Sequence, residues 1–345
     1  MMAYAEGTKA CTGSLSAAQA WLLDDGARLH LHHGPIDLLI SATGTAFEVK
    51  SAYRQGTLAF QSVLDDLVAQ LPLLRTRLSC QGASEELFNG PVARSMFAAS
   101  NPFASKAVTP MIAVAGAVAD HVMQALLENR RLQRACVNNG GDIALYLSDT
   151  SSYRVGVCRS PDAGGFDDTI TLTSADDVGG IATSGWQGRS HSLGVADAVT
   201  VLAKTAAMAD AAATIIANAV DIPHSPRIKR VPACELNPDS DLGKRLVTTD
   251  VSCLSSVECS IALDAGRRVA QQLWADRLIA SAYLTLQNKS LVVGQPTESE
   301  SSLMSPRVKH KFQLSQEPVA ITLKPDRKKS SQHQSVDFCH YEVST

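Results

Sequence analysis

The feature that most constrains the fold is a series of short apolar runs, patterned like β-strands and joined by turns of only a few residues. ACV precedes the turn NNGGD, and IALYL, YRVGVC and TITLT follow it. Parallel strands need a crossover of a dozen residues or more, so such short turns favour antiparallel hairpins. Helical patterns stand before and after these runs without regular alternation. The sequence therefore predicts an α+β fold with largely antiparallel sheets packed against helices.

Four segments carry apolar residues at helical spacing: 53–71, 110–127, 205–220 and 255–274. The second is rich in alanine and glycine, which predicts that another helix, a sheet or a ligand packs very close to it, and the third is rich in alanine. The stretches 80–109 and 222–253 are expected to be connections. Strands are expected within 27–49, with a turn at Thr43–Thr45, and in a closing hairpin after 279. In the last helix we expect a buried stripe of Val257, Ile261, Ala265, Val269 and Leu273.

Composition bounds the organisation and the partners of the chain. Its 345 residues predict one α+β domain over 21–294, an irregular segment over 1–20 and a disordered tail over 295–345. The net charge of −3 and the 5% of aromatic residues argue against a nucleic-acid partner. We expect no secretory signal and no membrane span, and the scattered cysteines lack a CxxC pair, so a cytoplasmic location is expected.

The first candidate site is the turn itself, in which Asn139, Gly140, Gly141 and Asp142 follow an apolar strand. Glycines permit positive φ and let a ligand approach the backbone, and successive amide groups can cradle phosphate. Asp142 could accept hydrogen bonds or take a proton. The alternative is a plain hairpin turn, which needs the same residue types.

The second candidate is ADAAAT, in which Asp210 and Thr214 stand four residues apart on one face of a predicted helix. A carboxylate and a hydroxyl are hard oxygen ligands suited to Mg²⁺ on a diphosphate. The alternative is an aspartate that makes a local hydrogen bond and a threonine that bonds back to its own helix.

The third candidate is the segment GIATSGWQGRSHS, which gathers hydroxyls, glycines and two cationic side chains. Arg189 could bind phosphate and His191 could act as a general base. A serine hydrolase is disfavoured because no GxSxG elbow follows a strand. The other residues singled out as ligand contacts are Thr183, Ser184 and Gly185.

Taken in order, these motifs resemble the ApbE family, which moves FMN from FAD onto a Thr or Ser of a target protein, or cleaves FAD, with Mg²⁺. The match is closer to an uncharacterised bacterial and archaeal branch. The shared features, in order, are AVAGAVAD (Ala113–Asp120), GGD (Gly140–Asp142), TSG (Thr183–Gly185), His191, VTVLA (Val199–Ala203) and ADAAAT (Ala209–Thr214).

The resemblance implies a T-fold-like α+β architecture, FAD as substrate or ligand, and Mg²⁺ held by Asp210, Thr214 and a backbone carbonyl. It also implies Asp142 or His191 as the group that activates the acceptor. Two departures stand out: Ala115 replaces a lysine of the transferases, and the segment around His191 is shortened. Two alternatives stay open, namely an enzyme for another phosphorylated small molecule and a flavin-binding accessory protein without turnover. A protein acceptor and a homo-oligomer also stay open.

Two other regions were weighed for ligand contacts. The loop DSDLGKR over 239–245 is at least as well explained by a capped turn into the next element. His30 and His32 share one face of a predicted strand, where metal binding competes with the interpretation of an exposed strand edge.

Overall fold

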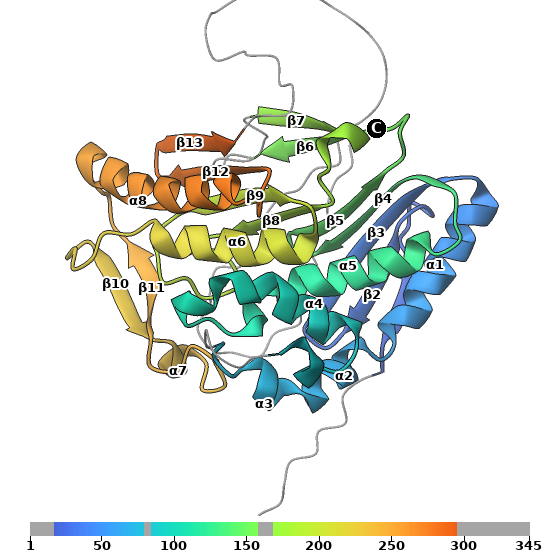
Figure 1. The fold of residues 1–345 in the computed structure, drawn as a ribbon, viewed down its shortest axis with the longest axis horizontal. Coiled ribbons are helices and arrows are strands. Elements are labelled where there is room, and N and C mark those ends of the chain that lie inside the picture. The colour runs from blue at the N-terminus through green and yellow to red at the C-terminus, as the bar shows by residue number, and fades with distance from the viewer. Residues whose placement is uncertain (1–16, 79–83, 158–167, 295–345) are drawn as a thin grey trace, which may run out of the picture.

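The computed structural model describes residues 17–78, 84–157 and 168–294 (Figure 1). Its centre is a nine-stranded sheet in which every neighbouring pair runs antiparallel, as the short turns predicted. In spatial order the strands are β1 (Gln19–Leu22), β2 (Leu29–His33), β3 (Ile36–Gly44), β4 (Leu132–Asn139), β5 (Asp142–Leu147), β8 (Gly180–Ser184), β9 (Ala198–Ala203), β12 (Ser281–Leu286) and β13 (Lys289–Gly294).

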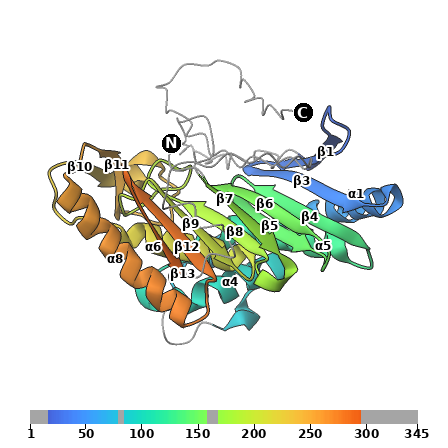
Figure 2. The same ribbon diagram turned by 90° about the horizontal axis from the view of Figure 1, so that it is seen from above.

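Helices cover one face of this sheet, and a small hairpin lies against the other (Figure 2). The α+β class predicted from the sequence is therefore confirmed. The helices are α1 (Ala46–Phe60), α2 (Val63–Ala69), α3 (Leu71–Leu74), α4 (Pro91–Ser100), α5 (Val114–Leu127), α6 (Ala206–Ala219), α7 (Ala233–Leu236) and α8 (Ser256–Ala275). The two-stranded sheets are β6 (Ser152–Val157) with β7 (Asp168–Thr173), and β10 (Ile228–Pro232) with β11 (Leu246–Val251).

Strand alternation separates the two faces of the sheet residue by residue. Val137, Ala144, Ala182 and Val201 belong to the core beneath the helices. Their immediate neighbours in the chain belong to the core beneath the β6–β7 hairpin: Cys136, Ile143, Ile181 and Leu202. Because side chains alternate along a strand, this parity also tells which flanking polar residues face the helices.

Helices α5 and α6 form the middle of the helical layer and run away from each other from a shared starting region (Figure 1). A Cβ atom on Gly116 would lie 2.2 Å from the carbonyl oxygen of Ala206, so the two backbones touch there. A Cβ atom on Gly180 of β8 would lie 2.2 Å from the nitrogen of Ala206. The close packing predicted for the helix over 110–127 is thus confirmed.

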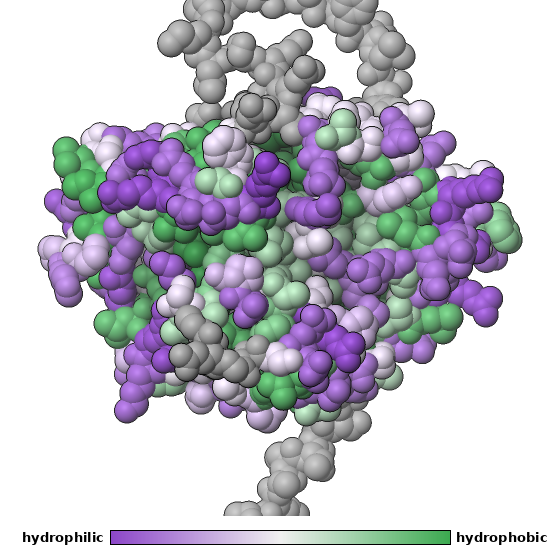
Figure 3. Space-filling view, in the orientation of Figure 1, coloured by the Kyte–Doolittle hydropathy of each residue, from purple (hydrophilic) through white to green (hydrophobic). Residues whose placement is uncertain are grey.

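The 3-10 helix η3 (Pro110–Ala113) leads directly into α5, and together they make an apolar helical stretch from Pro110 to Leu127. By length and composition alone this stretch could cross a membrane. In the fold it packs against α1, α4, α6 and the sheet, as a core helix does. Figure 3, in the orientation of Figure 1, shows hydrophobic surface over the middle of the helical layer and hydrophilic residues around its rim.

Several local expectations were wrong. Residues 80–109 hold α4, whose Val92, Met96 and Phe97 are buried at helical spacing behind a first-turn Pro91. Residues 222–253 hold β10 and β11. In the last helix, Val257 and Ile261 are exposed, and the buried face is Cys259, Ala262, Leu263, Gly266, Ala270 and Leu273.

The first hairpin also differs from expectation. The turn between β2 and β3 lies at Gly34, which has a φ of 58°, and not at Thr43–Thr45. Thr45 instead caps α1, because its hydroxyl accepts from the Glu48 amide at 3.4 Å. β2 is not an edge strand, since it pairs with β1 on one side and β3 on the other. The predicted tail over 295–345 and most of the predicted irregular segment over 1–20 lie outside the described residues.

Candidate functional site

The glycine motif forms the tip of the β4–β5 hairpin. Asn139 and Asp142 pair in register, so Gly140 and Gly141 alone make the turn, with φ values of 64° and 111°. Both central residues of a tight hairpin turn need positive φ, and glycine adopts it without strain. The hairpin interpretation of this motif is therefore confirmed, and it does not compete with a binding role for the same backbone.

Two asparagines fix this turn in place. The Asn138 side-chain oxygen accepts from the Gly141 amide at 2.8 Å. The Asn139 side-chain amide donates to the Ala115 carbonyl oxygen at 3.0 Å. The second bond ties the turn to the start of α5, so the hairpin tip and the helix are held together.

Asp142 opens β5 and has the same strand parity as Ala144, so its side chain faces the helical layer. Burial is the main cause that raises its pKa to about 7, while the charge of Arg189 and a hydrogen bond from the Thr183 amide lower it. A carboxyl group with this pKa exchanges its proton near neutral pH, as a general base must.

Arg189 arches over the glycine turn. A Cβ atom on Gly140 would lie 1.2 Å from one guanidinium nitrogen of Arg189, so no larger residue could occupy this position while the arginine stays where it is. Arg189 itself is exposed. The third motif thus contributes a cation to the first motif, although the two are far apart in the sequence.

Asp210 reaches from α6 to the first turn of α5. One of its carboxylate oxygens accepts from the Gly116 amide at 3.1 Å, and the Ala115 amide also donates to this side chain. Burial raises the pKa of Asp210 well above its usual value, and the charges of Asp142 and Asp120 raise it further. These hydrogen bonds come from α5, so the alternative interpretation, a hydrogen bond local to the helix of Asp210, is wrong.

Asp120, on α5, makes the reciprocal contact. Its two carboxylate oxygens accept from the Ala206 and Ala207 amides at the start of α6, each at 2.9 Å. Burial raises the pKa of Asp120 to about 6, against the lowering effect of these two hydrogen bonds. In the sequence Asp120 stands out only as the last residue of the AVAGAVAD motif. Its role could have been predicted from an aspartate inside an apolar helix, because a buried carboxylate needs a partner.

Thr214 lies one helical turn after Asp210 on α6 and is partly buried. Among the described residues, no group of three or more His, Cys, Asp or Glu side chains is placed to hold a metal ion. The predicted Mg²⁺ ligands are one carboxylate, one hydroxyl and one backbone carbonyl. The lack of such a three-residue group in the described ranges does not test them, so the Mg²⁺ site stays a prediction.

The TSG segment is divided between the two faces of the sheet. The Thr183 hydroxyl lies 2.9 Å from the Thr200 hydroxyl. Strand parity places both side chains on the face of the sheet away from the helices, so Thr183 contacts Asp142 only through its backbone. Ser184 has the helix-facing parity. A Cβ atom on Gly185 would lie 2.2 Å from the Asp197 carbonyl oxygen, which explains this glycine by packing.

The segment that follows is tied to the far end of α6. The Asn218 side-chain oxygen accepts from the Leu193 amide at 2.8 Å and from the Ser192 hydroxyl at 3.3 Å. His191, partly buried, stands directly before these contacts and two residues after Arg189.

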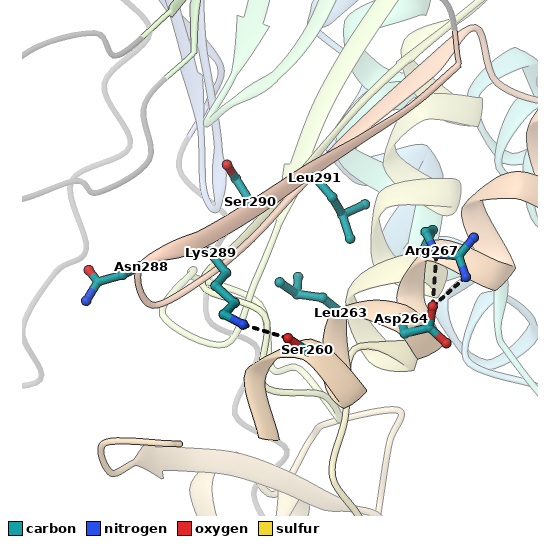
Figure 4. A pocket seen from close by; sticks show the side chains of 8 residues that line it. All are labelled: Ser260, Leu263, Asp264, Arg267, Asn288, Lys289, Ser290 and Leu291. Carbon is teal, nitrogen blue, oxygen red and sulfur yellow. Dashed lines mark hydrogen bonds and ion pairs between the residues drawn. The ribbon is translucent and has the colours of Figure 1, made fainter. Parts of the chain in front are cut away.

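A surface groove elsewhere lies between α8 and the β12–β13 hairpin (Figure 4). Lys289 donates to the Ser260 hydroxyl at 2.6 Å, and Asp264 pairs with Arg267. Its polar groups thus satisfy one another, and it lies on elements remote from Asp142 and Asp210. The groove is lined by Ser260, Leu263, Asp264, Arg267, Asn288, Lys289, Ser290 and Leu291.

The geometry brings the glycine turn, Asp142, Arg189 and Asp210 to one place, where α5 and α6 begin. A family model described as AbpE bacteria matches residues 19–296, which is most of the chain. The chain belongs to this bacterial ApbE-like family. The matched range begins at the first strand of the sheet and runs two residues beyond its last, so the family unit contains the whole site.

Relatives of this family member include uncharacterised archaeal proteins. The UPF0280 protein of Methanococcus vannielii is 44% identical over 114 residues, which cover 32% of this chain and 45% of that protein. A UPF0280 protein of Methanopyrus kandleri is 37% identical over 162 residues, covering 46% and 60%. The chain thus matches about half the length of these curated relatives.

Two solved structures are distantly similar to this member. The ApbE protein of Thermotoga maritima has 13% sequence identity and a TM-score of 0.40, over 81% of this chain and 98% of that one. The flavin transferase ApbE of Vibrio cholerae has 12% identity and a TM-score of 0.40, over 77% and 96%.

Proposed function

We propose that this protein is a Mg²⁺-dependent enzyme that cleaves the diphosphate of FAD and passes FMN to a hydroxyl acceptor. The acceptor is a Thr or Ser of a target protein, or water. The observation that supports this proposal best is the convergence of Asp142 and Asp210. They come from two separate motifs of the family, β5 and α6, and lie close enough for each charge to act on the other.

The donor set fits a divalent cation. Two carboxyl groups in mutual range, both with a raised pKa, are stabilised in their charged form when a cation offsets their repulsion. Asp210 and Thr214 would hold Mg²⁺, with a backbone carbonyl near the start of α5 as a further oxygen ligand. When bound, Mg²⁺ offsets the negative charge that develops on the diphosphate oxygens.

The surroundings fit a diphosphate. Arg189 lies over the backbone of Gly140, so a phosphate beside the turn would meet both the guanidinium and open backbone. The first turns of α5 and α6 also meet beside Asp210, and the N-terminus of a helix carries partial positive charge. The Arg189 guanidinium and the helix N-termini would thus meet the diphosphate oxygens, and the Asp142 and Asp210 carboxylates would meet the metal ion.

The reaction breaks the bond between the FMN phosphorus and the oxygen that bridges to AMP. The acceptor oxygen forms the new bond to phosphorus, AMP leaves with the bridging oxygen, and the acceptor proton passes to a base. We assign that base to Asp142, which follows the glycine turn and faces the helical layer, with His191 as the alternative group.

A second candidate rests on Ala115, which stands where the resemblance places a lysine. Ala115 contributes only its backbone to the site, because its carbonyl accepts from Asn139 and its amide contacts Asp210. A site that lacks this cation suits a ligand with different charge from the transferase substrate. The alternative is therefore metal-dependent action on another phosphorylated small molecule, or flavin binding without turnover.

The test is incubation of the purified protein with FAD, with and without Mg²⁺, followed by chromatography for AMP, FMN and covalently bound flavin. We expect AMP release that needs Mg²⁺ and that falls at least a hundredfold in Asp210→Asn, which keeps the size of the side chain. Flavin binding without AMP release would support the accessory alternative. If the protein neither binds flavin nor releases AMP, flavin is not its substrate.

Thr214 offers a matched pair of variants. Thr214→Ser keeps the hydroxyl ligand, whereas Thr214→Val keeps the shape and removes it. We expect Thr214→Val to raise the Mg²⁺ concentration needed for half-maximal AMP release at least tenfold, and Thr214→Ser to stay within threefold of the wild type. Equal behaviour of the two variants would exclude Thr214 as a metal ligand.

A further inference from the structure

A second cluster of polar residues lies where three distant segments meet, at the N-terminal end of η3. The Leu78 amide donates to the Val108 carbonyl at 2.8 Å, which places the end of the α3 region beside residue 108. The Thr109 hydroxyl donates to an Asp241 carboxylate oxygen at 2.5 Å. The loop over 239–245, which the sequence analysis weighed as a ligand contact, is thus joined to this corner of the fold.

These links bring two arginines together. Arg77 directly precedes Leu78, and Arg245 follows Asp241 in the same turn, where its amide donates to the Leu242 carbonyl at 3.1 Å. Neither guanidinium has a hydrogen bond or ion pair with another residue of the described ranges. Arg245 is partly buried, and burial, followed by the charge of Arg77, lowers its pKa, while Asp241 acts in the opposite direction.

Positive charge gathers at this corner. The charge of Arg77 acts on Arg245, and the Asp241 carboxylate that acts on Arg245 is already engaged by the Thr109 hydroxyl. Keeping two like charges close, with one of them half removed from water, costs stability unless an anion offsets them. Guanidinium groups match oxyanions in geometry, because each can donate two parallel hydrogen bonds to a phosphate or carboxylate.

We propose that Arg77 and Arg245 form a second anion-binding site, which takes a phosphate or carboxylate group beside the Thr109–Asp241 contact. The site goes beyond the proposed function, since none of its residues belongs to the motifs around Asp142 and Asp210. The DSDLGKR loop is then both a turn into β11 and a ligand contact, because it brings Arg245 to Arg77.

The position of this site relates it to the first. Thr109 caps η3 by accepting from the Met111 amide at 3.3 Å, and η3 continues into α5. Gly116, whose amide binds Asp210, lies seven residues after Thr109, which corresponds to about 12 Å along the helix. One elongated ligand could therefore place its diphosphate near Asp210 and a second anionic group between the arginines, or a separate anion could bind there.

Inorganic phosphate tests the site directly. The full chain is titrated with phosphate at constant ionic strength, and binding is read from the shift in Tm and by calorimetry. We expect Arg245→Met to weaken phosphate binding at least tenfold. The matched control is Lys244→Met, which removes an exposed charge from the neighbouring position and should change binding less than twofold.

Arg77→Met is a second test variant, because Arg77 is exposed and its loss leaves the packing intact. It should weaken phosphate binding as Arg245→Met does. Equal binding by the wild type and both arginine variants, or an equal loss in Lys244→Met, would overturn the proposal.

Asp210→Asn and FAD separate the two sources of the anion. Phosphate binding at the arginines should survive in Asp210→Asn, so failure of the flavin proposal would leave this result unaffected. FAD carries no anionic group besides its diphosphate, so weaker FAD binding in Arg245→Met would mean that the arginines contact that diphosphate and form no separate site, which would overturn the proposal. If Arg245→Met weakens phosphate binding alone, the arginines bind a separate anion, which supports the site.

Discussion

Helices α5 and α6 begin side by side, yet their first turns are held in different ways. α6 has a cap of its own, because the Thr205 hydroxyl accepts from the Met208 amide at 3.2 Å, and it has a second one in Asp120 from α5. α5 begins after Ala113, which offers no side-chain cap, and receives Asp210 from α6. Each helix therefore lends the other a carboxylate, but α6 is capped twice.

The two carboxylates also differ in their charged neighbours. Asp120 binds two backbone amides, and burial is the one cause that raises its pKa. Asp210 is raised by burial and, in addition, by Asp142 and by Asp120. Both side chains accept from two backbone amides, but Asp210 also has the like charges of Asp142 and Asp120 close by, and a cation offsets that repulsion. The difference separates a carboxylate that positions helices from one that is suited to a ligand.

Gly116→Ala is expected to have the largest effect on this shared region. The new Cβ atom would lie 2.2 Å from the Ala206 carbonyl oxygen and 2.6 Å from the Ala207 nitrogen, both of which are backbone. The helices must separate to admit it, and both reciprocal caps lengthen. We expect the free energy of unfolding to fall by about 3 kcal/mol, measured by urea denaturation.

Gly56→Ala is the matched control. Gly56 is also helical and also packs on α5, but its Cβ atom would meet only side chains, those of Leu126 at 3.1 Å and Val122 at 3.5 Å, which can shift. Because alanine favours helix by up to about 1 kcal/mol, this variant should be close to neutral. A loss in Gly56→Ala equal to that in Gly116→Ala would show that the backbone contact is not special.

The next prediction contrasts Asp120→Asn with Asp210→Asn. Asparagine keeps one acceptor oxygen, so at position 120 one of two amides loses its partner, and we expect a loss of about 1.5 kcal/mol in the free energy of unfolding at pH 7. At position 210 one of the bonds from the Gly116 and Ala115 amides is lost as well, but repulsion from Asp142 and Asp120 disappears. The metal-free Asp210→Asn protein should therefore lose less stability than Asp120→Asn.

Both proteins are compared by urea denaturation with EDTA present, and then by Mg²⁺-dependent AMP release. Asp210→Asn should lose turnover with the smaller loss of stability, and Asp120→Asn should lose more stability but retain turnover. Thr205→Ala controls for a lost α6 cap, with an expected cost of about 1 kcal/mol. If Asp210→Asn is the less stable of the two aspartate variants, capping outweighs repulsion and the distinction drawn here fails.

The fold could be predicted from the sequence where pattern and turn length agree. Short turns between alternating runs indicated antiparallel pairing, and alanine content indicated close helix packing. Elements were missed where local signals conflicted: α4 begins with Pro91 in a stretch rich in turn formers, and the side of α8 that carries Val257 and Ile261 is apolar but exposed. Which apolar stripe of a helix is buried depends on the neighbouring elements, which periodicity does not contain.

The site could be predicted as a set of residues but not as a set of contacts. The motifs named Asp142, Asp210 and Arg189, and the structure brings these three together. Nothing local to the sequence shows that Thr183 turns its hydroxyl toward Thr200, since that depends on strand register. The contact of Asp120 with the start of α6 spans 86 residues, so it becomes visible only when the two helices are placed.

The smallest expected effect concerns pH and separates burial from capping at Asp120. Its pKa rises from 3.8 to about 6 on folding, so the folded state binds this proton more tightly than the unfolded state. Its contribution to stability is then fully present below about pH 4, is lost as pH rises to about 6, and is constant above. Asp120→Asn lacks this titration. We therefore expect the difference in unfolding free energy, wild type minus variant, to fall by about 1 kcal/mol between pH 5 and 6.5.

Taking the difference removes the common background. Asp25, Glu258 and Asp264 have a lowered pKa and destabilise both proteins as pH falls, so their contributions cancel. Urea denaturation at four pH values with EDTA present suffices for the measurement. A difference that grows with pH would mean that the amides of Ala206 and Ala207 stabilise the charged form more than burial destabilises it. In that case Asp120 would be held as an anion, and the contrast with Asp210 would rest on the charges around Asp210 alone.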